Sequence, residues 1–537
     1  PVSHRLKSGV SIVSNLSDLL PAGAAAKQLT FTDSGSGITS KKPVVLESDG
    51  DVTEVSETST SESAGTPASY AATLLPTYYA LSAGYDTNRD VHFWSSSGDA
   101  SGSYTYYPKF NCATLSGSTF TLRSTTTVLS NDQTGNQMVT CFHPPSNLVV
   151  FFNAENEQNY VMPITIGSNG TSVTLGSTNQ SLGIGGYGTK GYPVQAVYDE
   201  DSEWIVMMMV DNQTRPRLVA VKPSGSGSSA SISVGTSNQI FTDTIKYPTL
   251  YYDKSQNKIV AGYTDDNQSN KFYLHEITVN SSTGALSSGT RVVLSSDAQK
   301  YSSMVYDENA ERGIYVGGSG SADANAYQAM AIQLSSGSFT VGTALAKSDF
   351  SGINTGGGET VRTRGSYSRG RAIIYHPTAK ATYFFYRQQS NAYLGAWAIT
   401  CSGNTLTAGS MITTSSTNLQ RGELGLSYDP DTEYIGIFSN AYVSSSHQQY
   451  FQAYRPAYST TNLTATNFVG IADSALGAGA AGSVIVQGGT VTGLSSLTAG
   501  SNYYVRPDGT FNTSAGSPSV KAGLAISTTA LLLNGDS

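Results

Sequence analysis

One motif recurs at regular spacing across most of this 537-residue chain. The segments YPTLYYDKSQNKIVAGYTDDN from Tyr247 and YSSMVYDENAERGIYVGGSGS from Tyr301 share a plan: an apolar run ends in Tyr-Asp, a polar turn follows, and a second apolar run begins. The residue after the aromatic one serves as the anchor of each copy. Seven anchors are found: Asp86, His143, Asp199, Asp253, Asp307, His376 and Asp429. They lie 57, 56, 54, 54, 69 and 53 residues apart. Such a period indicates a repeat fold.

Each copy predicts four strands. The first run alternates in polarity, and an Asp at its end can accept hydrogen bonds from backbone N–H groups two residues on, which starts a turn. His143 and His376 are each followed by Pro, and we expect a turn role for both rather than metal binding or catalysis. The second run is often continuously apolar, as in WIVMMMV from Trp204, which is typical of a strand buried on both faces. Met207, Met208 and Met209 are therefore expected in the core.

Seven units whose second strands are buried on both faces predict an all-β, seven-bladed β-propeller, because each blade covers its neighbours and a closed ring exposes only short edges. An open solenoid is the alternative. The ring must close, and the seventh unit shows no evident fourth strand. We predict that Val52–Val55, within KKPVVLESDGDVTEVS, supplies it. In the alternative, this stretch belongs to an N-terminal arm and the last blade has three strands.

The segments before and after the repeats lack the repeated motif, and they define two further predicted domains. Residues 1–65 form an N-terminal attachment arm that includes the possible ring-closing strand, and residues 66–460 form the propeller. Residues 461–537 form a small C-terminal β domain with a turn at Pro507-Asp508-Gly509. The apolar runs VIV, LAI and LLL of this domain need more cover than about 75 residues easily provide, so we expect it to associate with other copies.

Composition limits the possible partners. The net charge of −8 argues against a nucleic-acid surface, because phosphate binding relies on clustered Lys and Arg. No run approaches the roughly 18 apolar residues of a membrane span, and no secretory signal is evident. Three sparse cysteines indicate free thiols rather than a disulfide framework. The six histidines are scattered along the chain and do not have the spacing of a metal-binding motif. We therefore expect no cofactor and no metal.

Three flanking segments carry a resemblance. Their order, with the repeats between the first and second, is Lys42–Gly50 (KPVVLESDG), Asn462–Ala472 (NLTATNFVGIA) and Leu497–Gly509 (LTAGSNYYVRPDG). This arrangement resembles virion structural proteins of tailed bacteriophages, particularly the tail or fibre proteins of marine phages. The resemblance implies a virion component made in the host cytoplasm, present in many copies, bound to other virion proteins and, by analogy with phage fibres, homotrimeric. It transfers no catalytic residue.

One basic cluster stands out. Arg362, Arg364, Arg369 and Arg371 lie within ten residues, in the insertion that lengthens one spacing to 69. Guanidinium groups suit phosphate or carboxylate recognition, so this loop is a candidate contact for an anionic glycan or a partner. A solvated loop, or salt bridges within an assembly, is the alternative.

The most favoured function is a tail fibre or host-facing appendage whose propeller loops recognise the host surface. Capsid decoration or a head fibre is an alternative, as is a glycan-binding propeller, because 33 Tyr with Asn and Gln in loops suit sugar stacking. A sialidase-like, glycan-degrading enzyme is a further alternative. Its Ser-x-Asp-x-Gly-x-Thr-Trp boxes have only one poor match, at Ser48-Asp49-Gly50, and the arginines are not spread over the repeats. We therefore expect no enzyme.

Overall fold

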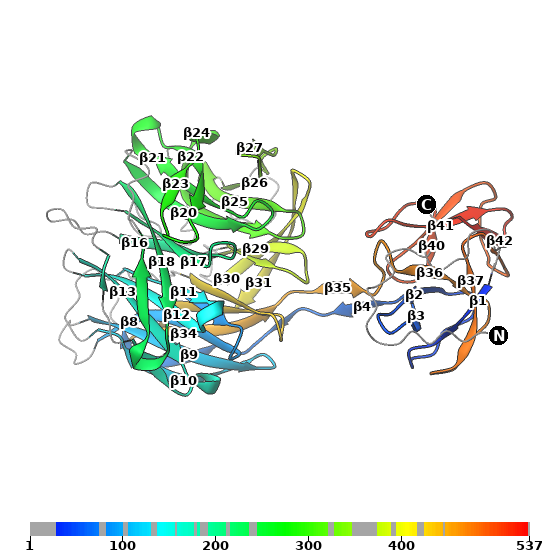
Figure 1. The fold of residues 1–537 in the computed structure, drawn as a ribbon, viewed down its shortest axis with the longest axis horizontal. Coiled ribbons are helices and arrows are strands. Elements are labelled where there is room, and N and C mark those ends of the chain that lie inside the picture. The colour runs from blue at the N-terminus through cyan, green and yellow to red at the C-terminus, as the bar shows by residue number, and fades with distance from the viewer. Residues whose placement is uncertain are drawn as a thin grey trace. The chain divides into compact units, whose positions relative to one another are not determined.

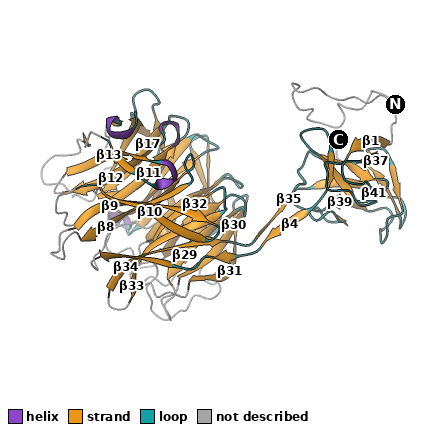
Figure 2. Ribbon diagram, turned by 90° about the horizontal axis from the view of Figure 1, so that it is seen from below, coloured by secondary structure: helices purple, strands orange, loops and turns teal. Residues whose placement is uncertain are grey.

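The computed structural model contains two compact units. One comprises residues 62–456, and the other combines residues 1–61 with residues 457–537. In both units the regular structure of the described residues is almost entirely β-strand (Figures 1 and 2). The structure describes residues 28–74, 82–99, 106–129, 137–155, 158–176, 180–182, 192–210, 215–235, 244–319, 327–345, 373–387, 394–415, 424–443 and 446–534.

The third repeat shows how each copy of the motif folds. β16 (Tyr192–Asp199) ends at the anchor, and β17 (Trp204–Val210), β18 (Pro216–Ser224) and β19 (Ser231–Val234) follow in one antiparallel sheet. The side chains of Met207, Met208 and Met209 in β17 have no exposed surface, which confirms that they belong to the core. A strand this apolar is covered on both faces because the sheets on either side pack against it.

The other repeats have the same order of strands. The first comprises β7 (Ala83–Asp86), β8 (Val91–Asp99), β9 (Tyr106–Ser116) and β10 (Thr119–Thr127). The second comprises β11 (Gln137–His143), β12 (Leu148–Glu155), β13 (Gln158–Ile166) and β14 (Val173–Leu175), with β15 (Gln180–Ser181) also on β13. The fourth comprises β20 (Ile245–Asp253), β21 (Lys258–Asp265), β22 (Lys271–Val279) and β23 (Leu286–Ser288).

The fourth and fifth repeats share one long strand. β24 (Val292–Asp307) pairs first with β22 and then with β25 (Arg312–Ser319), which is followed by β26 (Tyr327–Ser335) and β27 (Ser338–Val341). The sixth comprises β28 (Ile373–His376), β29 (Ala381–Arg387), β30 (Leu394–Ser402) and β31 (Thr405–Ser415). The seventh begins with β32 (Leu424–Asp429), β33 (Tyr434–Val443) and β34 (Ser446–Arg455). The all-β propeller fold is thus confirmed, and in the described residues every anchor ends the first strand of its repeat.

The ring is closed by a strand from the N-terminal side, at a different place from the one predicted. β5 (Ser63–Ala64) and β6 (Ala68–Leu74) both pair with β34, through pairs such as Ala64 with Tyr454 and Ala68 with Phe451. The prediction that Val52–Val55 closes the ring is wrong, and so is the three-stranded alternative for the last blade. Val52–Glu54 forms β3, which pairs with β2 (Pro43–Leu46) in the other unit.

Local chemistry explains why β3 stays with β2. The Ser-Asp-Gly stretch makes a tight turn in which Gly50 N donates to Glu47 O at 3.1 Å. The buried side chains of Val45 and Val55 join the core of the second unit. Both apolar runs of this stretch are therefore used within one hairpin, and neither is left for the propeller.

The second unit combines segments from both sides of the propeller. One sheet has the order β1 (Gln28–Thr32), β37 (Ala481–Val486), β36 (Phe468–Ala472), β2, β3. The other has the order β38 (Thr490–Thr492), β42 (Ala530–Leu533), β41 (Val520–Ala525), β39 (Asn502–Val505), β40 (Phe511–Asn512). A two-stranded ribbon of β4 (Glu57–Thr60) and β35 (Tyr458–Thr461) completes the unit.

The C-terminal apolar runs are mostly covered within the chain. Val484, Leu531 and Leu533 are buried in cores that residues 28–56 help to form. The need for cover therefore gives no reason for self-association, although Ile526 remains 52% exposed. The turn predicted at Pro507-Asp508-Gly509 is present, with Gly509 N donating to Arg506 O at 3.0 Å.

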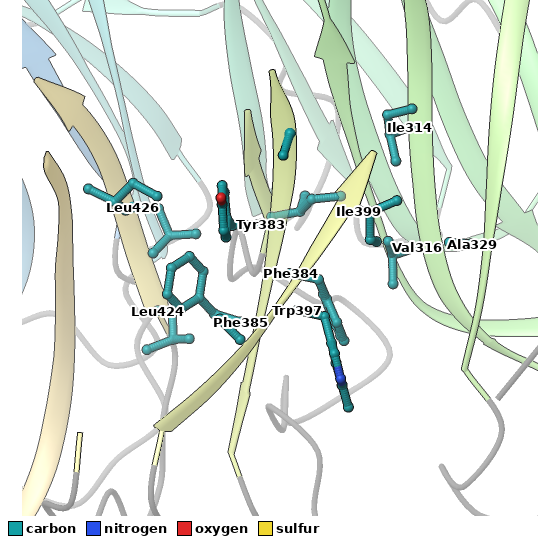
Figure 3. Packing of buried hydrophobic residues seen from close by; sticks show 14 of the residues in the cluster. Ile314, Val316, Ala329, Tyr383, Phe384, Phe385, Trp397, Ile399, Leu424 and Leu426 are labelled. Atoms are coloured by element: carbon teal, nitrogen blue, oxygen red, sulfur yellow. The ribbon is translucent and has the colours of Figure 1, made fainter. Parts of the chain in front are cut away.

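Packing between blades follows from the alternation of side chains along each buried strand. In β29, Phe385 points toward Leu424 and Leu426 of the next blade, whereas Phe384 lies on the other side against Trp397 (Figure 3). The rings of Phe384 and Trp397 stack with centroids 6.2 Å apart. Each inner strand therefore contributes to the core on both of its faces.

Candidate functional site

The aspartate anchors cap the turns that follow them. Asp199 Oδ1 accepts from the backbone N–H of Asp201 at 3.1 Å and of Ser202 at 3.3 Å. Equivalent bonds are made in other repeats by Asp86, Asp253, Asp307 and Asp429. All five side chains are buried, and the backbone donors hold them in place. The predicted turn chemistry is thus confirmed for these residues.

The two histidine anchors perform the same task with a ring nitrogen. Nδ1 of His143 accepts from Ser146 N at 3.3 Å, and Nδ1 of His376 accepts from Ala379 N at 3.1 Å. Because Nδ1 accepts, the proton of each neutral ring lies on Nε2. That group donates to a carbonyl in the next blade, Glu203 O or Glu433 O, at 3.0 Å in each case. Burial lowers the pKa of both histidines. The predicted turn role of both histidines is confirmed. In addition, the Nε2 hydrogen bond of each histidine links two neighbouring blades.

In two repeats the hydroxyl of the tyrosine before the anchor bonds to a different turn from the anchor itself. Tyr306 Oη accepts from Ser255 N, and Tyr375 Oη accepts from Asn309 N, both at 3.1 Å. In each case the tyrosine reaches the turn of the preceding blade. Where that blade has a histidine anchor, the tyrosine packs edge-on to the ring: Tyr428 lies 4.9 Å from His376 between centroids. In these repeats the anchor shapes its own turn and the tyrosine joins two blades, whereas Tyr252 Oη donates to Asn257, in the turn of its own repeat, at 3.2 Å.

The junction between the last and first blades holds a Ser-His-Asp group. His92 Nδ1 lies 2.7 Å from Ser427 Oγ, and His92 Nε2 lies 3.6 Å from Asp429 Oδ2. The three residues are 0%, 3% and 3% exposed, so a substrate has no access to the hydroxyl. Burial lowers the pKa of His92. For Asp429, burial acts to raise the pKa, but His92 and hydrogen bonds from Thr432 hold it below its usual range. This group joins blades and is not a nucleophilic site.

The first strands of the repeats surround a central cavity of about 290 Å³. All seven contribute to its lining: β7, β11, β16, β20, β24, β28 and β32. Among the described lining residues none is charged. Gln195 is buried there, and its amide bonds to both backbone groups of Leu250, donating to O at 2.7 Å and accepting from N at 3.0 Å. No sequence motif pointed to this cavity, because it arises only when the ring closes.

The basic cluster singled out in the sequence lies outside the described residues, between β27 and β28. Its members are Arg362, Arg364, Arg369 and Arg371. Cys112 and Cys401 are buried and Cys141 is half-buried, and none of the three forms a disulfide. No group of side chains that could hold a metal ion occurs within the described ranges. None of the helices described is long and apolar enough to cross a membrane.

The turns after the anchors are strongly acidic. Between each anchor and the next strand, the seven turns together contain eight Asp or Glu residues and three Lys or Arg residues. Arg89, one of the three basic residues, pairs with Asp86 at 2.9 Å. These seven turns together therefore carry a net negative charge.

No protein-family model and no curated protein matches the chain. Solved structures similar to it include a periplasmic gluconolactonase of Pseudomonas aeruginosa, with 10% identity, 72% of this chain and 96% of that chain covered, and a TM-score of 0.41. A triple-arginine mutant of AofleA from Arthrobotrys oligospora has 8% identity, coverage of 82% and 95%, and a TM-score of 0.37. Trypanosoma rangeli sialidase has 11% identity, coverage of 79% and 60%, and a TM-score of 0.34. At such identities and TM-scores no activity transfers from these structures to this chain.

Proposed function

We propose that this chain is a structural protein of a tailed-phage virion, a tail fibre or other host-facing appendage. In this proposal the unit of residues 28–61 and 457–534 attaches to the particle, and the propeller contacts the host surface. One observation carries it: the propeller is inserted into the other unit. β4 leads to residue 62 and β35 follows residue 456, and the two strands pair, with Tyr458 opposite Thr60. A rigid ring held on a separate attachment domain suits recognition through loops.

The segments that resemble phage virion proteins all belong to the proposed attachment unit. Two of them are in direct contact, since Leu46 N donates to Asn467 O at 2.9 Å. Asn462 strengthens the same region by donating from Nδ2 to Glu54 O at 2.8 Å and accepting from Ser56 N at 2.9 Å. Residues from both sides of the propeller thus form one structural element. This supports a shared attachment domain, which in our proposal binds other virion proteins and forms a homotrimer.

Charge suggests which face of the propeller meets the host. The acidic anchor turns repel an anionic surface glycan, so in our proposal they face away from it. The four arginines lie between β27 and β28 in the sequence, separate from those turns. In the proposal they bind anionic groups of the host glycan. No catalytic step is proposed, because the described carboxylates of the anchors are committed to turns and none lines the cavity.

Removing the propeller tests the proposed function. Because Thr60 and Tyr458 are cross-strand partners, an Asn-Gly turn can replace residues 61–457 and close β4 onto β35 as a hairpin. We expect particles with this variant to assemble and retain the attachment unit, but to lose adsorption to host cells. Adsorption counts and electron microscopy of the particles provide the two measurements. Normal adsorption would reject host recognition, and the position of the missing density distinguishes a tail appendage from capsid decoration.

The arginine loop has a test of its own. Replacing Arg362, Arg364, Arg369 and Arg371 with Ser is expected to reduce adsorption and leave particle assembly intact, because the guanidinium contacts to anionic groups are lost. The matched control replaces the same four residues with Lys, which keeps the charge and removes the bidentate geometry. Partial adsorption by the Lys variant indicates that charge alone contributes. Unchanged adsorption by the Ser variant excludes this loop while leaving recognition by other loops open to the deletion test.

A further inference from the structure

The free edges of the first strands line the central cavity at equivalent positions. In every repeat the residue three before the anchor belongs to the lining. It also has the same register in every repeat, because it pairs with the residue eight after the anchor. The residues at this position are Ala83, Thr140, Ala196, Leu250, Met304, Ile373 and Leu426. Since the register is shared, their backbone N–H and C=O groups have the same orientation within each sheet.

In three repeats a side chain from the preceding blade caps this edge. Each cap comes from the residue four before the anchor: Ser82 on Thr140, Gln195 on Leu250 and Thr249 on Met304. The cap by Gln195 is the most complete, because its carboxamide donates to Leu250 O at 2.7 Å and accepts from Leu250 N at 3.0 Å. Backbone groups that bond to a preceding blade point away from the second strand of their own sheet. The edge groups at this position are therefore turned toward the centre of the ring.

The edge of Ala83 has no such cap within the described part of the chain. Ala83 pairs with Trp94, and the bond from Ser95 N to Ser82 O at 2.9 Å joins the adjacent pair of the ladder. Because hydrogen-bonded and non-hydrogen-bonded pairs alternate, the N–H and C=O of Ala83 point away from β8. The capping position in the preceding blade is occupied by Gly425, which has no side chain. A Cβ there would lie only 2.9 Å from the Cβ of Ala83, so this position has no room for a capping side chain.

A second edge of the same kind lies beside it. Leu426 of β32 has the same register, and the residue in its capping position is Ala372, whose side chain has no hydrogen-bonding group. The close approach of Gly425 to Ala83 places β32 next to β7. Tyr251 also belongs to the lining, and its buried hydroxyl has no partner among the described residues. Buried backbone groups that lack a partner are costly, so water or a ligand has to satisfy these edges.

From these edges we propose that the cavity binds a small neutral molecule that carries a primary carboxamide. The carboxamide pairs with the N–H and C=O of Ala83 as the carboxamide of Gln195 pairs with those of Leu250, and the rest of the molecule lies in the cavity of about 290 Å³. It replaces water at both groups at once, and displacing water is favourable only where its hydrogen bonds are reproduced. A charged ligand is disfavoured, because no described lining residue carries a charge to replace its hydration. This site is independent of the loops proposed to contact the host.

Benzamide tests the site on the full chain. Equilibrium dialysis is expected to show saturable binding of one molecule per chain. N,N-Dimethylbenzamide keeps the ring and the carbonyl but cannot donate to Ala83 O, so it should bind at least about tenfold more weakly. Benzoate should also bind more weakly, because its carboxylate has no donor and carries a charge. Equal binding of benzamide and N,N-dimethylbenzamide, or no saturable binding of benzamide by the folded protein, would overturn the proposal.

Two further measurements locate the bound benzamide. Ala83→Pro removes the N–H that points toward the cavity, a change that the free edge of a strand tolerates, and it should weaken binding at least about tenfold. The matched control, Ala83→Gly, retains this N–H and should bind benzamide as the wild type does. In the wild type, benzamide at about ten times its Kd should slow hydrogen exchange of the Ala83 N–H about tenfold, a measurement that does not depend on the folding of a variant. Unchanged exchange, or full binding by a folded Ala83→Pro variant, would reject the site.

Discussion

Replacing Gly65 by valine is expected to lower the free energy of unfolding of the propeller by about 3 kcal/mol, the upper part of the range for overpacked sites. Gly65 lies between β5 and β6, in the chain segment that closes the ring on β34. A Cβ at this position would lie 1.9 Å from the carbonyl oxygen of Ser118, in the first blade. Since that oxygen is backbone, relief requires the closing segment to move away from β34. The bond from Gly65 N to Ala453 O, at 2.8 Å, would then be lost.

The matched control is Gly289→Val, because a Cβ there meets only ordinary contacts, the nearest at 3.5 Å. Urea unfolding followed by tyrosine fluorescence measures both variants against the wild type. A Gly65→Val variant that is as stable as the Gly289→Val variant would mean that β5 and β6 are not needed to hold the ring closed. Deleting Val52–Glu54 is expected to destabilise the other unit and leave the unfolding of the propeller unchanged.

The parts of the fold that the sequence predicted are those determined by local chemistry. Each anchor and its turn lie within a few residues, so Asp199 and even His143 could be interpreted from their neighbours alone. The continuous apolar run of Trp204–Val210 likewise predicts, without any other residue, a strand that is buried on both faces. Such features repeat at a fixed spacing, which makes the β-propeller recognisable without any structure.

The closing strand could not be predicted in this way. Ala68–Leu74 has the sequence ASYAATL, in which Tyr70 is the one aromatic and Thr73 the one β-branched residue, fewer than a typical buried strand contains. Its place is set by pairing with β34, which lies at the far end of the propeller in sequence. Val52–Val55 is richer in β-branched residues and was the better candidate by pattern, but the hairpin with β2 uses it locally. Non-local pairing therefore determined closure, and local pattern could not reveal it.

The candidate sites show the same division. The sequence predicted a turn role for the anchor, but it gave no role to the tyrosine before it. Adjacent residues of a strand point in different directions, and Tyr306 bonds to the turn of another blade. The cavity depends on seven strands that only the ring brings together. The arginine cluster at 362–371 was visible in the sequence, and its role stays a prediction because those residues lie outside the described ranges.

Acidification below about pH 6.5 is expected to destabilise the propeller through its histidines at blade junctions. His143 and His376 are almost fully buried, and burial lowers the pKa of each from the usual 6.5. The unfolded chain therefore binds protons at these sites before the folded chain does. Stability falls as the pH drops below 6.5 and continues to fall until the lowered pKa of each histidine is reached. The loss amounts to at most about 1.4 kcal/mol per pH unit for each histidine.

The geometry gives a reason for this loss beyond burial. Protonation adds a hydrogen to Nδ1, which at present accepts from Ser146 N or Ala379 N, so the cap of each turn is lost. The groups facing His143 include Lys222, whose charge also lowers the pKa, and Glu203, which raises it. His376 faces Glu433. His92 lies 3.6 Å from Asp429, whose ionised carboxylate offsets part of the cost of protonation, so we expect a smaller contribution there.

The buried aspartates also make stability depend on pH, either in the opposite direction from the histidines or at lower pH. Burial raises the pKa of Asp199, Asp253 and Asp307, so the folded chain takes up these protons first and gains stability as the pH falls. The lowered pKa of Asp429 gives stability that is lost only below the usual aspartate range near 3.8. A measurement of total stability therefore mixes opposing contributions. The histidine contribution has to be isolated by comparing variants across the same pH values.

The double variant His143→Asn, His376→Asn provides that comparison. Asn Oδ1 can still cap the turn, as aspartate does in five other blades, but it does not titrate. At pH 7.5 the variant should be less stable than the wild type by roughly 1 kcal/mol for each lost Nε2 hydrogen bond. Toward pH 5 this deficit should shrink and reverse, because only the wild type continues to lose stability at these two sites. Urea unfolding at pH 7.5, 6.5, 5.5 and 5.0 measures the difference, and parallel curves for the two proteins would show that the junction histidines do not make the ring sensitive to acid.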